Sequence, residues 1–377
     1  QETYEPGHTA KPFTVAAGIE SGKMTGNEYY TCNGQLHVGD YDIKCHNYKS
    51  GGDGTLSVQQ SIEQSCNVAL MLMGQQIGKN IFLEYQDRFN FGLKTNIDLA
   101  GETRTEYLVF NDRNMGATEL ATSTFGQGYN VTMIQMISAF SSLINGGYYY
   151  EPHLVSKITA SDGSVVQNIN PRVVKQTLSS TTSEKIIEYC NGVVENGTGK
   201  TARPAGYAIG GKTGTAETIP RDKINYVVSF MGYAPADNPQ IAIYVVVDRP
   251  NTSDQDDAKF ATRIVRNILT ETLPYLNIYM TEELSESEKA ELSELNISVK
   301  KANVIEEDTP EDEEEPEPEV NEDGTIDANG GDTTSSTPVS EEEMQSDNVD
   351  TAPLTGTLLN PENTVIQTDG ITTQDGE

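Results

Sequence analysis

The sequence lacks several features that mark common classes of protein. No window holds about 18 or more consecutive apolar residues, so no segment reads as a membrane-spanning helix. The four cysteines form no Cys-x-x-Cys pair, which argues against a zinc ribbon. Basic residues are scarce, with 25 Lys and Arg against 57 Asp and Glu, so the chain offers no basic patch for nucleic acid.

The acidic residues gather toward the C-terminus. Residues 301–377 carry 23 Asp and Glu and a single Lys, a net charge of −22 out of −32 for the chain. Glu-Pro repeats and clusters of small polar residues leave this stretch too few large apolar side chains to offset its chain entropy. We therefore expect 1–280 to be the folded domain, 281–304 a short helix and linker, and 305–377 a disordered acidic tail.

Two of the cysteines flank a short Gly-rich segment. Cys32 and Cys45 lie on either side of a strand-turn pattern, and this spacing would close a small disulfide loop in an oxidising compartment. Two reduced thiols fit the spacing equally well. His37 and His46 lie nearby, but two His and two Cys at irregular spacing predict no metal site.

A more specific absence concerns one position near the N-terminus. Three short motifs follow one another along the chain: His8-Thr9-Ala10-Lys11, Ser65-Cys66-Asn67 and Lys212-Thr213-Gly214. They match the layout Ser-x-x-Lys, Ser-x-Asn and Lys-Thr-Gly of a serine acyl-transfer site. In that layout a serine stands three residues before the lysine, and here His8 stands there instead.

The spacing of apolar residues predicts helices first, then antiparallel strands, then a last helix. Pro12 falls in the first turn of the first helix, where a missing N–H is tolerated. This order predicts one α+β domain with a helical lobe and a sheet lobe. The expected helices are 8–21, two segments on either side of a break at 65–67, 118–147, 183–194 and 256–273, and the expected strands are 227–233, 241–247 and one starting at 212.

Over about residues 1–280 the chain resembles the transpeptidase domain of class B penicillin-binding proteins. The resemblance rests on the three motifs in this order and on the phrases Gly126-Gln127-Gly128, Asn145-Gly146-Gly147 and Gly197-Thr198-Gly199 between them. It implies the α+β fold of penicillin-binding proteins and serine β-lactamases, and cross-linking of peptidoglycan stem peptides that end in D-Ala-D-Ala. It also implies inhibition by β-lactams and no cofactor.

The same resemblance places the protein in the cell. It implies stem peptides, β-lactams and the cell-wall synthesis machinery as partners, on the extracytoplasmic face of a bacterial membrane. The family carries two strands and a helix before the first motif, so we expect this chain to be a C-terminal piece of a longer protein with an anchor upstream.

The family's catalytic roles can be matched onto this chain residue by residue. Lys11 would deprotonate the nucleophile at position 8, which requires its pKa to be lowered by burial or by nearby positive charge. Ser65 would pass a proton to the leaving amine, and Asn67 would bind the substrate amide. Lys212 would supply positive potential.

Substrate-binding roles fall on the strand that follows. Thr213, Gly214 and Thr215 would receive the terminal carboxylate, and the backbone N–H groups of residues 8 and 215 would form the oxyanion hole. Some sporulation-type members of the family form a redox-controlled disulfide near the active site, and Cys32 and Cys45 resemble such a pair.

His8 leaves the family assignment intact and puts the activity in question. An acyl-imidazole is labile, and the ring is far larger than a serine side chain. The hydroxyl of Thr9 points about 100° around the helix from position 8. We therefore expect little stable acylation. Two interpretations stay open: a D,D-transpeptidase that has lost its serine, or a pseudo-transpeptidase that acts as a scaffold or binding partner. The class B motifs within 118–217 argue against a penicillin sensor or a β-lactamase of the same superfamily.

Overall fold

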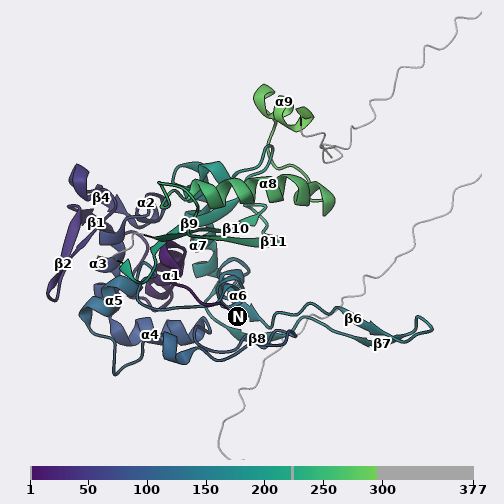
Figure 1. Cartoon of the computed structure of the whole chain (residues 1–377), viewed down its shortest axis with the longest axis horizontal. Helices are drawn as coiled ribbons and strands as arrows, with labels where there is room; N and C mark the ends of the chain where they lie inside the picture. The colour runs from purple at the N-terminus through teal and green to yellow at the C-terminus, as the bar shows by residue number, and fades with distance from the viewer. Residues whose placement is uncertain (1, 222–224, 295–377) are drawn as a thin grey trace, which may run out of the picture. The chain divides into compact units, whose positions relative to one another are not determined.

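The computed structural model describes residues 2–221 and 225–294 (Figure 1). The predicted acidic tail, 305–377, and the end of the predicted linker lie outside the described residues. Within the linker segment 281–304, a helix, α9, spans Glu286–Glu294.

A three-stranded antiparallel sheet forms the centre of the sheet lobe. Its strands are β9 (Gly210–Glu217), β10 (Tyr226–Ala234) and β11 (Ile241–Asp248), in the order β11-β10-β9. Because β-branched and aromatic residues dominate β10 and β11, these segments suit a pleated, two-sided surface. The predicted strands are confirmed, including the one that carries the Lys-Thr-Gly motif.

Both faces of this sheet are covered (Figure 1). Side chains alternate along β10, so Phe230 packs with the helix α8 (Lys259–Tyr275) on one face. Met231 and Tyr233 point to the other face and join the core of the helical lobe. The predicted C-terminal helix is thus confirmed, and it covers the face of the sheet opposite the other helices.

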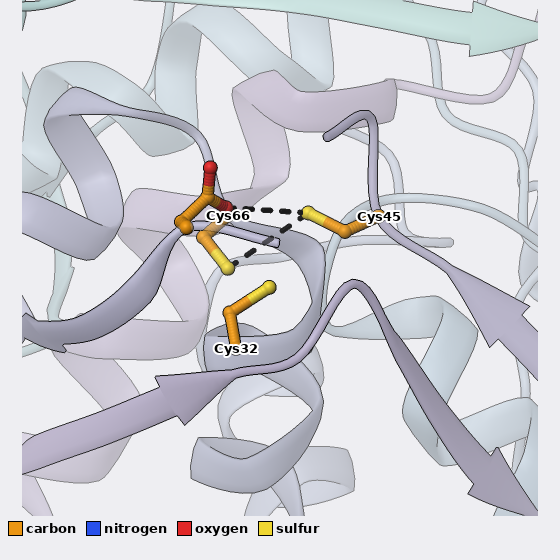
Figure 2. Close-up of side chains that lie close together, drawn as sticks. Cys32, Cys45 and Cys66 are labelled. Carbon is orange, nitrogen blue, oxygen red and sulfur yellow. Dashed lines mark hydrogen bonds between the residues drawn. The ribbon is translucent and has the colours of Figure 1, made fainter. Parts of the chain in front are cut away.

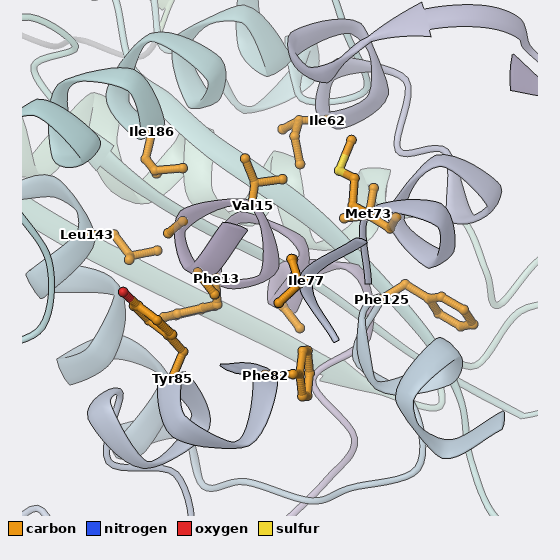
Figure 3. Packing of buried hydrophobic residues seen from close by; sticks show 14 of the residues in the cluster. Phe13, Val15, Ile62, Met73, Ile77, Phe82, Tyr85, Phe125, Leu143 and Ile186 are labelled. Atoms are coloured by element: carbon orange, nitrogen blue, oxygen red, sulfur yellow. The ribbon is translucent and has the colours of Figure 1, made fainter. Parts of the chain in front are cut away.

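The helical lobe surrounds the first long helix. Helix α1 is buried along most of its length, with Val15 and Ala16 completely inaccessible. Phe13, Val15, Ile62, Met73 and Ile77 meet in its core, as Figure 3 shows. The helices of this lobe are α1 (Lys11–Glu20), α2 (Val58–Glu63), α3 (Asn67–Ile77), α4 (Lys79–Arg88), α5 (Ala117–Ser123), α6 (Met133–Ile144) and α7 (Ser180–Glu195).

Several two-stranded antiparallel sheets accompany the helical lobe. Strands β6 and β7 form a hairpin that projects from the domain in Figure 1. The pairs are β1 (Tyr29–Cys32) with β4 (Gly54–Ser57), β2 (Gln35–Val38) with β3 (Tyr41–Lys44), β5 (Tyr148–Tyr150) with β8 (Val173–Gln176), and β6 (Lys157–Thr159) with β7 (Val165–Asn168).

The structure refines several predicted boundaries. The helix expected from residue 8 begins as a 3₁₀ turn, η1 (Gly7–Ala10), and becomes α-helical only at Lys11. The helical region expected over 118–147 is two helices, α5 and α6. The other 3₁₀ turns are η2 (Tyr48–Ser50), η3 (Glu106–Leu108) and η4 (Lys200–Ala202). In the part of the chain that the structure describes, no helix has both the length and the apolar character needed to cross a membrane.

Candidate active site

The first motif sits where η1 leads into α1, directly against β9. Gly7 adopts φ +57°, and a Cβ placed on it would lie 2.5 Å from the carbonyl oxygen of Thr215. Its N–H donates to the carbonyl of Gly126 at 2.9 Å. Only glycine permits this approach, because both the dihedral and the space exclude a side chain. The backbone of residue 8 is thereby held beside the Lys-Thr-Gly strand.

The second motif forms the sharp junction between α2 and α3. Ser57 and Gln60 make a capping box that starts α2, and Cys66 caps the start of α3. Between them Ser65 adopts φ +58°, a left-handed conformation that is uncommon for residues other than glycine. The predicted break at 65–67 is confirmed, and the turn directs the Ser65 hydroxyl toward the two motif lysines.

Two buried lysines converge on that hydroxyl. Lys11 Nζ lies 3.1 Å from Ser65 Oγ, and it also donates to Asn67 Oδ1 at 2.8 Å and to the Ser65 carbonyl at 2.5 Å. Lys212 Nζ approaches the same Ser65 Oγ from the sheet at 2.9 Å. Both lysines are fully buried. Residues far apart in the sequence thus form one hydrogen-bonded centre, with Ser65 between the two amines.

Burial sets the protonation of these amines. Desolvation lowers the pKa of Lys11 to about 7, against the opposing influence of the nearby thiols of Cys45 and Cys66. Burial, with a smaller contribution from the charge of Lys11, lowers the pKa of Lys212 well below its usual value. A free amine on Lys11 near neutral pH can accept a proton, and both amines lie within hydrogen-bonding distance of Ser65 Oγ. The centre is therefore arranged for proton transfer.

The third motif lies on β9 and faces the first across a tight contact. A Cβ on Gly214 would lie 2.1 Å from Ser229 Oγ and 2.9 Å from the methyl group of Thr9, so glycine is required there. Thr213 Oγ1 receives a hydrogen bond from Lys212 Nζ at 3.1 Å, and Thr215 is only half-buried. The Thr213 hydroxyl therefore belongs to the same centre as the lysines, whereas the Thr215 hydroxyl donates to the carbonyl of Asp256 at 3.4 Å.

Thr198 is a site residue that was assigned no role from the sequence. It belongs to the phrase Gly197-Thr198-Gly199, and its Oγ1 lies 2.7 Å from Thr213 Oγ1. Its N–H donates to the carbonyl of Glu63 at the end of α2. The position of this phrase shortly before Lys212 is the only sequence signal for Thr198. No periodicity in the sequence predicts its contact with Thr213.

His8 occupies the nucleophile position and remains partly accessible. Its ring packs edge-on against Phe125, with centroids 6.4 Å apart. Burial, and after it the charges of Lys11 and Lys212, lowers the pKa of His8 well below its ordinary range. The imidazole is therefore neutral at physiological pH. Thr9 does not substitute for serine, because its hydroxyl donates to the carbonyl of Pro6 at 2.7 Å.

The four cysteines are free thiols in the structure. The pairing of Cys32 with Cys45 stays a prediction, and the structure adds a third sulfur to it. Cys66, the middle residue of the second motif, brings its Sγ to 3.8 Å from that of Cys45.

A large cavity lies apart from this centre. A cavity of about 760 Å³ lies between the segment 2–5, the end of β9 and β11, and none of the motif residues lines it. The candidate active site is therefore identified by the converging motif side chains and not by the position of this cavity.

Comparison with known proteins agrees with this geometry. Residues 1–270 match the family model described as "Penicillin binding protein transpeptidase domain". Stage V sporulation protein D of Bacillus subtilis is 38% identical over 282 residues, which cover 73% of this chain and 43% of that protein. The peptidoglycan D,D-transpeptidase FtsI homolog of Mesostigma viride is 26% identical over 294 residues, covering 71% of this chain and 49% of that protein. The chain thus spans less than half the length of these two relatives.

Solved structures share the fold. Penicillin-binding protein 3 of Mycobacterium tuberculosis, crystallised in complex with ampicillin, superposes with a TM-score of 0.67 at 25% identity. The match covers 75% of this chain and 64% of that one. The predicted α+β fold with a helical lobe and an antiparallel sheet lobe is therefore confirmed.

Proposed function

Because the chain belongs to the penicillin-binding protein transpeptidase domain family, we propose that it forms the substrate pocket of a peptidoglycan D,D-transpeptidase whose position 8 carries no hydroxyl nucleophile. The observation that carries this proposal is the placement of Ser65 Oγ between Lys11 Nζ and Lys212 Nζ. The substrate class is the peptidoglycan stem peptide ending in D-Ala-D-Ala, and β-lactams are the corresponding inhibitors.

Acylation with a serine at position 8 would run through these residues in turn. Lys11, as a free amine, takes the hydroxyl proton while the oxygen attacks the carbonyl carbon of the penultimate D-Ala. The oxyanion is held by the backbone N–H groups of residues 8 and 215. Ser65 passes a proton from the lysine pair to the nitrogen of the terminal D-Ala, and the C–N bond breaks. An acceptor amine then attacks the ester carbonyl and gives a proton to Lys11, the C–O bond to the serine breaks, and the serine oxygen takes that proton back as the cross-link is released.

The substrate's other polar groups have partners in the same centre. Its terminal carboxylate would meet the hydroxyls of Thr213 and Thr215 and the charge of Lys212. Its backbone amide would meet the side chain of Asn67, which Lys11 already orients. Substrate binding therefore depends on side chains that are still present beside His8. Covalent chemistry depends on a serine hydroxyl, which His8 does not supply.

This separation favours a second candidate function, that of a pseudo-transpeptidase. A neutral imidazole at position 8 lacks a hydroxyl, while the pocket around it stays assembled. A pocket that binds stem peptide without turnover would act as a scaffold or binding partner in cell-wall synthesis. Since peptidoglycan lies outside the cell membrane, we place either function on the extracytoplasmic face, together with proteins of the cell-wall machinery.

Labelling with a fluorescent penicillin tests the proposal. The full chain is compared with His8→Ser and with His8→Ala, which removes the ring without adding a hydroxyl. We expect label that survives denaturation on His8→Ser only. Stable label on the unaltered chain would overturn the assignment of position 8 as a non-nucleophile. No label on a folded His8→Ser protein would show that the remaining residues do not form a competent acylation site.

A binding measurement separates the two candidate functions. Isothermal titration of the unaltered chain with a stem pentapeptide ending in D-Ala-D-Ala should show reversible binding if the pocket serves as a scaffold. Loss of that binding in Thr213→Val, but not in Thr25→Val at an exposed turn, would assign it to this pocket. Absence of any binding would reject the scaffold.

A further inference from the structure

A cluster of sulfur and oxygen atoms lies beside the junction between α2 and α3, here called the catalytic loop (64–67). None of its side chains contacts the reacting atoms in the steps described above. Cys32 ends β1, Cys45 follows β3, Asp53 precedes β4 and Cys66 begins α3. One ligand atom from each of the four lies within 4.8 Å of all the others. The three sulfurs point toward one another in Figure 2.

The cluster is sealed from solvent. Cys32 and Cys66 are completely inaccessible, and Cys45 is 4% exposed. The side chain of Asp53 is 1% exposed. A buried carboxylate among buried thiols is costly unless something offsets its charge. Within the described residues no lysine or arginine forms an ion pair with Asp53, and its one potential ion-pair partner is the ring of His46, with Nε2 at 4.0 Å. A metal ion bound among the thiols would offset the carboxylate charge directly.

Two distances from Cys45 Sγ match the edges of a zinc tetrahedron, and the remaining ligand atoms lie within 4.8 Å of one another. With Zn–S bonds of about 2.3 Å, two sulfurs on one tetrahedral zinc lie about 3.8 Å apart, and with Zn–O bonds of about 2.0 Å a sulfur and an oxygen lie about 3.5 Å apart. Cys45 Sγ lies 3.8 Å from Cys66 Sγ and 3.5 Å from Asp53 Oδ2. A disulfide bond, by contrast, holds its sulfurs at about 2.05 Å.

The surroundings of the cluster suit thiolate ligands. The N–H of Asn67 donates to Cys45 Sγ at 3.3 Å, and that of Ala69 donates to Cys66 Sγ at 3.5 Å. The second oxygen of Asp53 accepts a hydrogen bond from Asn47 Nδ2. Such outer contacts orient ligands and stabilise their charge in metal sites. Cys45, Cys66 and Asp53 thus each accept a hydrogen bond that fixes the side chain in place.

We propose that Cys32, Cys45, Cys66 and Asp53 bind one thiophilic divalent cation, best fitted by Zn²⁺, in a closed four-ligand structural site. Three sulfur ligands exclude Mg²⁺ and Ca²⁺, which prefer oxygen. On binding, three metal–sulfur bonds and one metal–oxygen bond form, and the protons carried by the thiols leave to solvent. The sequence predicted no metal site, because only the fold brings Asp53 and Cys66 to the pair Cys32 and Cys45.

A metal bound at this site would stabilise the conformation of the catalytic loop. Cys66 stands between Ser65 and Asn67, so a metal bound to its sulfur would join that loop to the small sheets β1–β4 and β2–β3. The junction that carries the left-handed Ser65 would then be fixed from both sides. Metal removal should loosen this loop without removing any group that contacts substrate. The proposal stands whether or not the transpeptidase assignment does.

Metal content and cobalt spectroscopy test the site on the full chain, prepared without an affinity tag. We expect about one zinc per chain by inductively coupled plasma mass spectrometry. Replacement by Co²⁺ should give the intense visible bands and thiolate charge-transfer absorption of a tetrahedral sulfur-rich site. Zinc removal by a chelator should lower Tm, and zinc addition should restore it.

Variants assign the ligands. Cys32→Ser and Asp53→Asn should each weaken zinc affinity at least tenfold and alter the cobalt spectrum. Cys190→Ser, at a buried thiol outside the cluster, should leave one zinc per chain. If the cysteine variant does not fold, circular dichroism will show it, and the Asp53→Asn result decides alone. Either a folded chain without zinc whose thiols all react with an alkylating reagent, or a metal-free chain with Cys45 disulfide-bonded to Cys66, would overturn the proposal.

Discussion

The pKa of Lys11 gives a pH profile that can be measured once a nucleophile is present. The perturbation is His8→Ser, and the observable is the rate constant of acylation by a fluorescent penicillin. Lys11 is fully buried, and its amine bonds to Ser65 and Asn67. Since only the free amine can take the hydroxyl proton, the rate should follow the deprotonated fraction of Lys11.

The magnitude follows from the lowered pKa. With a pKa of about 7 in place of 10.5, about half of the Lys11 amines are free at pH 7, against roughly 3 in 10,000 for an unperturbed lysine. Between pH 6 and pH 8 the free fraction should rise about tenfold and then level off. An unperturbed lysine would give a rise of about a hundredfold over the same range, with no plateau.

The assay is a time course of labelling at fixed reagent, stopped in denaturant and quantified on a gel from pH 5.5 to pH 9. Circular dichroism at each pH confirms that the chain remains folded. His8→Ser combined with Lys11→Gln serves as the control and should lose labelling at every pH. A hundredfold rise that continues beyond pH 8, or a rate independent of pH, would refute the role given to Lys11.

Two further predictions concern the packing that holds the site. Gly126→Ala would place a Cβ 1.9 Å from the carbonyl oxygen of Gly7, whereas Gly51→Ala meets the same positive φ with no atom within 4 Å. Chemical denaturation should show about 1–2 kcal/mol lost for Gly51→Ala and more for Gly126→Ala, and equal losses would contradict the steric argument. Phe13→Ala should cost about 3–5 kcal/mol in urea unfolding, because this ring packs edge-on against Phe89 with centroids 5.1 Å apart. A loss below about 1 kcal/mol would show that the core around α1 is not tightly packed.

Much of the site could be predicted from the sequence because it rests on local patterns. The break at 65–67 and the strand that starts near Lys212 follow from short runs of consecutive residues, and both appear where expected. The runs of β-branched and aromatic residues around Phe230 and Val245 predicted neighbouring strands, because such residues are typical of strands in a sheet. These elements bring the three motifs to the places where their side chains can meet.

The rest depended on contacts that no local pattern encodes. The left-handed backbone of Ser65 and the bond between Thr198 and Thr213 arise only once α2, α7 and β9 pack together. Asp53 and Cys66 are 13 residues apart, with strand β4 and helix α2 between them, so their approach to Cys32 could not be foreseen. Tertiary packing, rather than propensity, decides such contacts.

The two buried lysines have a consequence for the stability of the domain. Holding the amines of Lys11 and Lys212 away from water costs the fold stability whether or not residue 8 can react. Replacement of both by methionine or leucine would relieve that cost, and it would also remove both amines that contact Ser65. The centre is therefore assembled at the expense of stability, and a single substitution at position 8 would suffice to supply the missing hydroxyl.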